Sequence, residues 1–477
     1  MPKQFLLFAP FFLFFSVLYG QSALVSDPVF IRTDYGYELI GRLRDRILIF
    51  RDRYDDFVVQ GFDAQMKLSW TKELDDLDHR GTRILGVVPG RNDFSVVYQT
   101  RRRGHTVLRI HKYDPGANLI DSMEVKDYGE RIFNTPKLEL EQSDDRNCVV
   151  VYNTAERDRI EATCIYLDKM QTPWDHMAIV EDVSDIFESR EPEVTLSNNG
   201  QFFWITERNN RKSKLERHEL EVIRFDGSGV NINHTPLGSY LTVELKFAFD
   251  HQSQQLTGAG LWTDKGRERS SGVFYLRLKP GRDSSMILKY EAFDEKFLSI
   301  LRQKDVAEGS KGIVDAQLQE VLLRQDGGII LVAERYREVQ RGASAGRGFF
   351  RDGMRMIVDY YYDDVFVLAI QPNGQVQWKS ALHKKQYSQD DDGTFSSYFL
   401  MRTPERMRFF FNDEIKYENT CSEYVLSAAG EFDRNSLLNT LNQSLRLRFR
   451  DALQMNANEC LVPSEYRGRL KLVLLRF

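Results

Sequence analysis

The chain has 477 residues, of which 42% are hydrophobic and 12% aromatic, and its formal net charge is −5. That length suggests two or three ordinary domains, but closed all-β folds often run long as one domain, so length alone does not force a division. The mildly acidic balance gives no reason to expect a nucleic-acid partner.

The first twenty residues have the layout of a secretory signal peptide. Lys3 supplies a positive start, and the apolar run from Phe5 to Tyr19 is too short to span a bilayer comfortably. Gly20 stands where a signal peptidase can cut, and a retained N-terminal anchor is the alternative. We therefore expect a signal peptide at residues 1–20 and no transmembrane helix after its removal. The mature chain is then exported to the periplasm, the cell surface or the medium.

A short phrase recurs along the rest of the chain: an apolar run, a turn, and a Trp or apolar residue that opens the next strand. Its clearest copies are Phe57–Trp70, Ala162–Trp174 and Val365–Trp378. Recurrence at roughly fifty residues is the period of a four-stranded propeller blade. Many of the strand segments are continuous apolar runs, which is typical of strands covered on both faces.

The repeat predicts an all-β fold, a single β-propeller over residues 21–477 with about eight four-stranded blades, seven being the near alternative. The expected third strands of the blades lie near residues 56–62, 106–113, 161–167, 219–225, 272–278, 364–370, 423–428 and 469–477. The chain ends inside the last unit, so another segment must complete it. We expect the N-terminal strand at Val25–Arg32 to do so, which closes the ring and removes its open edges.

The interval between the fifth and sixth units is much longer than the others, and we expect an insertion there at about residues 293–360. Phe293–Val306 has the apolar spacing of a helix, and a Gly- and Arg-rich hairpin follows at Glu338–Tyr360.

The turn-plus-Trp phrase resembles the docking motif of quinoprotein-type propellers, in which an acidic residue or Asn, a Gly turn and a Trp lock adjacent blades. The matching residues are Asp63, Trp70, Asp168, Trp174, Asn373 and Trp378. The resemblance implies packing and not catalysis, because quinone-dependent enzymes of that kind also need a Ca²⁺ site and a vicinal disulfide, and no two cysteines are adjacent here. Tyr360–Tyr398 also resembles a stretch of uncharacterised secreted proteins of Bacteroidota, which implies export but no known chemistry.

Cys148 and Cys164 lie on consecutive predicted strands on either side of a turn. A cross-strand disulfide between them is geometrically possible in an exported protein, but a slip of one residue in register would place the two thiols on opposite faces. No Cys, His or acidic residues have metal-ligand spacing, and no GxSxG, P-loop or Rossmann pattern occurs. We therefore expect no metal and no cofactor.

Basic residues gather in the predicted turns between second and third strands, which emerge on one face of a propeller. They are Arg101, Arg102, Arg103, Arg157, Arg159, Arg208, Arg211, Lys212, Lys214, Lys265, Arg267 and Arg269. A mildly acidic chain would then carry one basic face that attracts anionic partners. The alternative is that these charges only keep the turns solvated and discourage edge-to-edge aggregation.

No catalytic pattern stands out, which favours a non-enzymatic scaffold over an enzyme. We expect an exported binding module whose partner is a protein or an anionic envelope component, such as a glycan or a lipid head group. The alternative is a glycoside hydrolase or lyase that acts on polysaccharide from a funnel at the ring centre. The sequence leaves the oligomeric state open.

Overall fold

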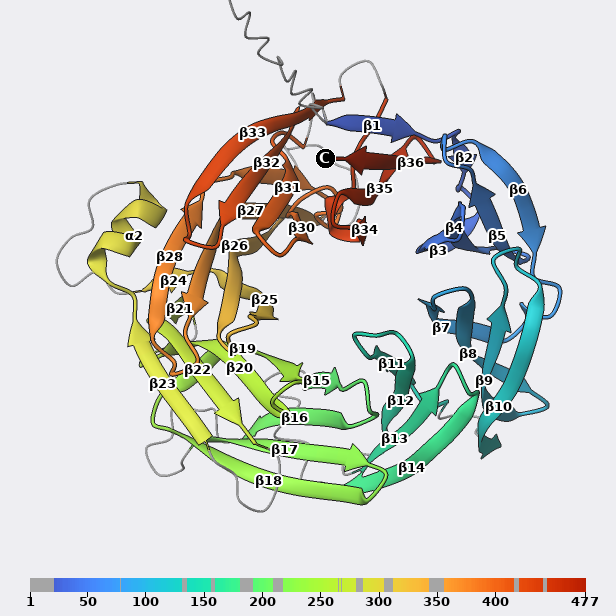
Figure 1. The fold of residues 1–477 in the computed structure, drawn as a ribbon, viewed down its shortest axis with the longest axis horizontal. Helices are drawn as coiled ribbons and strands as arrows, with labels where there is room; N and C mark the ends of the chain where they lie inside the picture. Colours follow the sequence, from blue (N-terminus) through green and yellow to red (C-terminus); the bar gives the residue numbers. More distant parts are fainter. Residues whose placement is uncertain are drawn as a thin grey trace, which may run out of the picture.

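The fold is a closed ring of eight antiparallel sheets, as the repeat predicted (Figure 1). The computed structural model describes residues 21–77, 79–130, 135–155, 159–180, 192–208, 218–264, 266, 268–279, 286–303, 312–342, 356–415, 420–440 and 444–477. In each blade the first strand lies nearest the central axis and the fourth lies at the outside of the ring.

The first four blades follow one another directly in the sequence. They consist of β3 (Asp34–Leu43), β4 (Arg46–Arg53), β5 (Phe57–Phe62) and β6 (Leu68–Glu73); β7 (Thr82–Pro89), β8 (Phe94–Arg102), β9 (His105–Tyr113) and β10 (Leu119–Glu130); β11 (Glu139–Gln142), β12 (Cys148–Ala155), β13 (Arg159–Tyr166) and β14 (Gln171–Ile179); and β15 (Glu193–Leu196), β16 (Phe202–Arg208), β17 (His218–Asp226) and β18 (Gly229–Gly238).

The next three blades follow the same order, with additional elements in the fifth and sixth. They consist of β19 (Leu241–Asp250), β20 (Gln255–Thr263), β22 (Gly272–Leu278) and β23 (Met286–Ala292); β25 (Ala316–Leu323), β26 (Ile329–Gly342), β27 (Met356–Ile370) and β28 (Val376–Leu382); and β30 (Phe399–Arg402), β31 (Arg406–Asn412), β32 (Thr420–Ser427) and β33 (Phe432–Asn439). In addition, β21 (Arg269–Ser270) pairs with β24 (Ile313–Val314), and β29 (Gln386–Gln389) pairs with β27.

The eighth blade joins the two ends of the chain. Its inner strands are β34 (Leu453–Asn456), β35 (Glu459–Tyr466) and β36 (Arg469–Arg476), and its outer strand is β1 (Ser22–Val25). The short strand β2 (Val29–Phe30) also pairs with β36. Closure by an N-terminal strand is confirmed, and the pairing begins at Ser22, slightly before the expected segment. Because β1 pairs with β36, the last blade is complete and β36 is not left as an unpaired edge.

The core lies between the blades. Within the described residues, each gap between adjacent blades is filled by its own cluster of buried apolar side chains. The central strands therefore bury both faces, and β5 is buried at every position. This explains why they read as continuous apolar runs instead of alternating ones.

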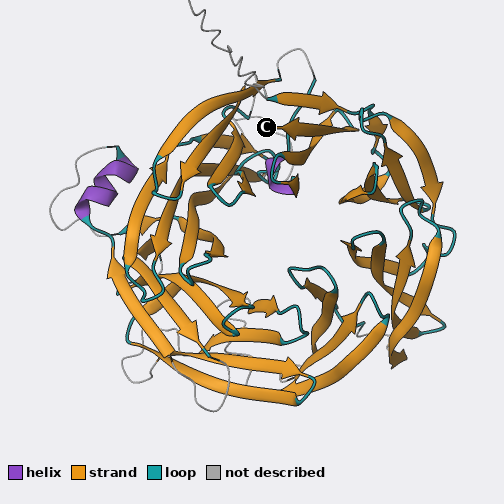
Figure 2. Cartoon of the chain, viewed as in Figure 1, coloured by secondary structure: helices purple, strands orange, loops and turns teal. Residues whose placement is uncertain are grey.

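The predicted helix is present and shorter than expected. Helix α2 (Glu295–Arg302) lies outside the ring, between the fifth and sixth blades (Figure 2). Asp294 caps its first turn by accepting a hydrogen bond from the Phe297 N–H (2.8 Å), and Phe297, Leu298 and Leu301 pack into the gap between the two blades. Residues 293–360 also contain β25 and β26 of the sixth blade, and the tip of the predicted hairpin lies outside the described residues.

The described residues also contain η1 (Phe449–Asp451), a single 3₁₀ turn next to the central opening. None of the helices in the described part of the chain is long and apolar enough to cross a membrane.

Candidate functional site

The strands of each blade alternate in direction, so the two faces of the ring carry different loops. The turns after the second strands emerge on the same face as the connections between blades, and we call it the connection face; it carries the turns at 54–56, 103–104 and 467–468. The turns after the first and third strands emerge on the opposite face.

Arg101, Arg102 and Arg103 are exposed on the connection face, at a tight turn. Arg102 pairs with His105, which leaves a two-residue loop of Arg103 and Gly104 with φ of 50° and 88°. Positive φ at both loop residues is the signature of the turn that matches the twist of a hairpin. The hairpin therefore places three consecutive exposed arginines at the tip of the second blade.

The other predicted basic residues have different surroundings. Arg159 and Arg269 are exposed, whereas Arg208 is half-buried and forms an ion pair with buried Glu221. Arg157, Arg211, Lys212, Lys214, Lys265 and Arg267 lie outside the described residues. Of the predicted set, the described members that are exposed come from the second, third and fifth blades.

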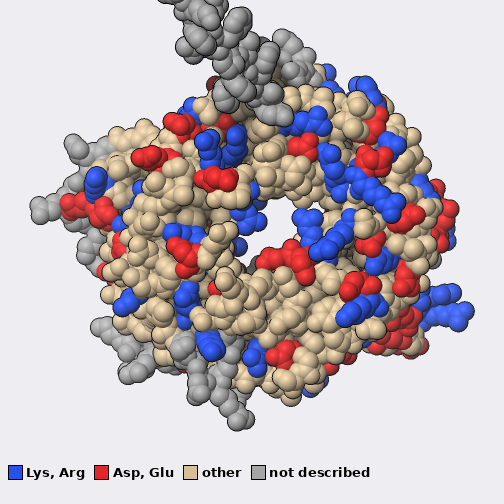
Figure 3. All heavy atoms as spheres, in the orientation of Figure 1, with Lys and Arg blue, Asp and Glu red and all other residues tan. Residues whose placement is uncertain are grey.

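The charge around the central opening is mixed on the face that Figure 3 shows. Lys and Arg side chains lie beside Asp and Glu side chains along the rim, and the opening passes through the ring. The predicted basic character therefore concerns individual turns and does not describe that rim as a whole.

The Trp residues of the repeat touch the next blade along the chain. The Trp174 indole N–H donates to the Gly200 carbonyl (2.9 Å), and the Trp378 indole N–H donates to the Ala428 carbonyl (3.0 Å). Trp70 lies against Gly61, where a side chain would collide with the indole at 2.4 Å, and packs into the gap between the first and second blades.

The polar residues of the repeat shape the turns that precede the Trp strands. Asp63 accepts from the backbone N–H groups of Gln65 and Lys67. Asp168 and Asn373 accept from the N–H of Lys169 and of Gln375, respectively. Side chains of this kind stabilise turns by local hydrogen bonds to the backbone.

Cys148 and Cys164 are buried free thiols, with their sulfur atoms 3.3 Å apart. They are not directly opposite: Cys148 pairs with Tyr166, and Cys164 pairs with Val150. Two residues of offset keep both side chains on the same face of the blade. The disulfide between them stays a prediction.

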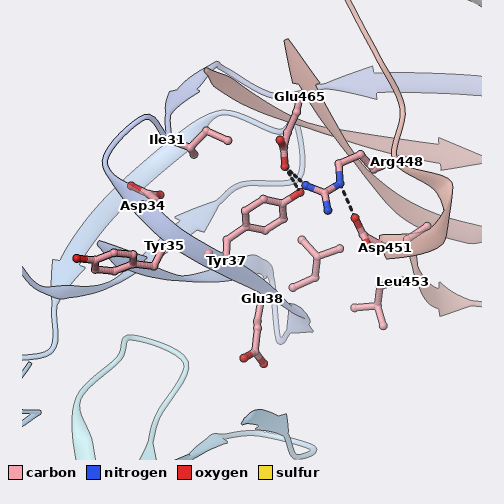
Figure 4. A pocket seen from close by; sticks show the side chains of 12 residues that line it. Ile31, Asp34, Tyr35, Tyr37, Glu38, Arg448, Asp451, Leu453 and Glu465 are labelled. Carbon is pink, nitrogen blue, oxygen red and sulfur yellow. Dashed lines mark hydrogen bonds and ion pairs between the residues drawn. The ribbon is translucent and has the colours of Figure 1, made fainter. Parts of the chain in front are cut away.

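The feature that sequence reasoning missed is a pocket of about 620 Å³ on the connection face, at the seam between the eighth and first blades (Figure 4). Its walls come from β3 and from the segment around η1. Tyr37 points toward Glu465 and Arg448, and Glu38 points the other way.

The polar groups of this pocket are tied to one another. The Tyr37 hydroxyl donates to Glu465 Oε1 (2.9 Å), and Arg448 forms ion pairs with Glu465 and Asp451. Burial raises the pKa of the Tyr37 phenol, although the nearby Arg448 charge opposes this shift. The Tyr37 hydroxyl is therefore kept as a neutral donor.

Two further carboxyl groups, those of Asp34 and Glu38, line the pocket. Asp34 forms a bidentate ion pair with buried Arg51 through N···O distances of 2.7 and 3.0 Å. Burial raises the pKa of Glu38, while a hydrogen bond from the Val87 N–H (2.9 Å) opposes the shift. The pocket thus offers fixed donors and acceptors, with carboxyl groups outnumbering guanidinium groups.

A carboxyl with a strongly shifted pKa lies elsewhere on the inner strands. Burial raises the pKa of Glu141 on β11 to about 7, helped by the negative charges of Asp144 and Glu193. Within the described residues, no group of three or more His, Cys, Asp or Glu side chains is arranged to hold a metal ion.

Comparison with known proteins assigns the chain to no family. No family model matches the chain, and no curated protein matches it. An uncharacterised protein of Listeria monocytogenes is similar in structure, with 8% identity over 81% of this chain and 93% of that one and a TM-score of 0.38. The match to dipeptidyl peptidase 4 of Porphyromonas gingivalis has 10% identity, covers 90% of this chain and 56% of the peptidase chain, and gives a TM-score of 0.44. The match to a prolyl endopeptidase has 11% identity, covers 93% of this chain and 55% of the endopeptidase chain, and gives a TM-score of 0.36.

Proposed function

We propose that this propeller is an exported binding module, not an enzyme, and that it engages an anionic protein or envelope component through its connection face. The observation that carries the proposal is the exposure of Arg101, Arg102 and Arg103 at the tip of the hairpin formed by β8 and β9. Exposed charges of one sign attract an oppositely charged partner over the Debye length, about 8 Å at physiological salt. Export is part of the proposal because residues 1–20 have the layout of a signal peptide. N-terminal sequencing of the native protein should find a start near Gln21.

A binding titration against anionic vesicles, an anionic polysaccharide and a solubilised envelope fraction tests this function. The variant Arg101→Ser/Arg102→Ser/Arg103→Ser should associate more slowly with its partner, because charges at a rim act chiefly on encounter. The difference should shrink at high salt, where the charges of the native turn are screened.

The matched control removes the same charge from the opposite face, as Arg91→Ser/Arg146→Ser/Lys169→Ser. These three residues are exposed in turns after first and third strands. Association rates that fall equally in both variants would mean that only net charge matters. Rates that are unchanged in both would mean that the arginines only keep the turn solvated.

The alternative, an enzyme that acts on polysaccharide, is supported by one observation. A carboxyl with a pKa of about 7 beside other carboxyl groups, as at Glu141, is the environment of a general acid. Release of reducing ends from a polysaccharide, abolished by Glu141→Gln, would favour the enzyme over the scaffold.

A further inference from the structure

Exposed aromatic side chains gather at the seam between the eighth and first blades. Phe30, Tyr35 and Tyr54 expose 64%, 68% and 65% of their surface, and Tyr35 also lines the pocket at this seam. The Tyr35 ring lies 6.0 Å from that of Tyr54 and 6.4 Å from that of His79, with the second pair nearly parallel at 17°. Large apolar groups left together in water mark a binding surface.

The backbone and ion pairs of the seam hold these rings in place. Arg51 donates to the Phe30 carbonyl and to both oxygens of Asp34, the residue before Tyr35. The Tyr54 N–H donates to the Thr33 carbonyl (2.9 Å). The aromatic positions are thus fixed by a closed network that links β2, β3 and the turn after β4.

The polar wall of the adjoining pocket carries more carboxylates than cations. Arg448 faces two carboxylates, those of Glu465 and Asp451, whereas Asp34 is matched by Arg51. An anionic ligand would meet the surplus carboxylates, and a protein interface would need a larger apolar centre than the pocket offers. Hydroxyl groups fit this wall, because they donate to the carboxylates and accept from the Arg448 guanidinium.

We propose that this seam binds a neutral oligosaccharide. One sugar ring lies on the Tyr35 and Tyr54 rings, because the C–H face of a pyranose is apolar and slightly positive, whereas the face of an aromatic ring is negative. The next sugar enters the pocket, where its hydroxyls meet the carboxylates of Glu465 and Asp451 and the guanidinium of Arg448. The volume of about 620 Å³ lies within the range of small-molecule sites, about 300–1,000 Å³.

This inference rests on the proposed role as a binding module, but it uses side chains other than those of the Arg101–Arg103 turn. The experiment is isothermal titration of the mature chain with maltohexaose, cellohexaose, xylohexaose, mannohexaose and chitohexaose. At least one should bind, with an affinity that does not depend on salt. Tyr35→Ala should weaken that binding about tenfold, the scale of one aromatic stacking contact.

Two further variants separate stacking from a general loss of structure. Tyr35→Trp keeps an aromatic face and should retain binding. Tyr387→Ala removes an exposed tyrosine from β29 of the sixth blade, and should leave binding unchanged. Equal melting temperatures of Tyr35→Ala and the native protein show that the fold is intact.

The proposal is overturned if none of the five oligosaccharides binds, or if Tyr35→Ala binds as well as the native protein. Loss of the bound sugar at high salt, or capture of a protein instead of a sugar at this seam, would also overturn it. The Arg101–Arg103 variant discriminates between the two proposals, because it should change salt-dependent association with anions and leave oligosaccharide binding untouched.

Discussion

Glu141 lies on the innermost strand of the third blade, where its carboxyl group is half-buried and close to other carboxyl groups. Its pKa rises from an ordinary 4.5 to about 7, so the folded chain holds the proton more tightly than the unfolded chain. The stability that this group contributes is therefore fully present below about pH 4.5 and lost as pH rises through about 7. Above pH 7 the folded protein must carry an unfavourable buried charge.

Replacing Glu141 with Gln removes that charge and keeps the shape of the side chain. We expect Glu141→Gln to raise the free energy of unfolding by roughly 2 kcal/mol at pH 8 and by much less at pH 5. Urea denaturation at the two pH values measures the difference. Glu139→Gln, which removes a carboxyl group at an exposed position of the same strand, serves as the control. A gain for Glu141→Gln of equal size at both pH values would contradict the argument.

At the scale of the strand, single substitutions can measure how much the hydrogen bond of each repeat Trp contributes to the free energy of unfolding. Trp174 is buried at 6% exposure and stacks on Phe225 of the next blade. Trp174→Phe keeps most of this packing but leaves the Gly200 carbonyl without its indole donor. We expect a loss of about 1 kcal/mol in the free energy of unfolding.

Trp378→Phe is the matched control, because its equivalent hydrogen bond to Ala428 is exposed to water. Water can replace that donor, so the loss of unfolding free energy should be smaller. Urea midpoints of the two variants give the comparison. A larger loss for Trp378→Phe than for Trp174→Phe would contradict the assignment of Trp174 as a buried inter-blade contact.

The strands were predictable from the sequence because each blade repeats one pattern of burial. The expected third strands at 56–62 and 423–428 correspond to β5 and β32, and the others fall on the third strands in the same way. The pocket at the seam was not predictable. Tyr37 and Glu465 are 428 positions apart, and only closure of the ring brings them within hydrogen-bond distance. No local signal in either segment points to the other.

At the scale of the whole molecule, closure of the ring depends on the short N-terminal segment that contains β1 and β2. The strand β1 pairs with β36 over Ser22–Val25, and Ser26 exchanges two hydrogen bonds of 2.8 Å with the backbone of Leu472. Val29 is buried between the eighth and first blades. This segment covers an edge that would otherwise expose the unpaired N–H and C=O groups of β36.

Removing residues 22–30 from a chain that begins at Gln21 should therefore have two effects. The melting temperature should fall by several degrees, since the eighth blade loses its outer strand and the gap to the first blade loses Val29. The bare edge of β36 should also pair with a second copy, so size-exclusion chromatography should show concentration-dependent association.

A synthetic peptide of residues 21–32, added in excess, should restore both the melting temperature and the elution volume of the intact chain, because it binds only the folded ring. Replacing Leu24 by Pro within that peptide removes the backbone N–H at the centre of the strand, and this change should abolish the rescue. An unchanged melting temperature after the deletion would show that the ring stays closed without β1.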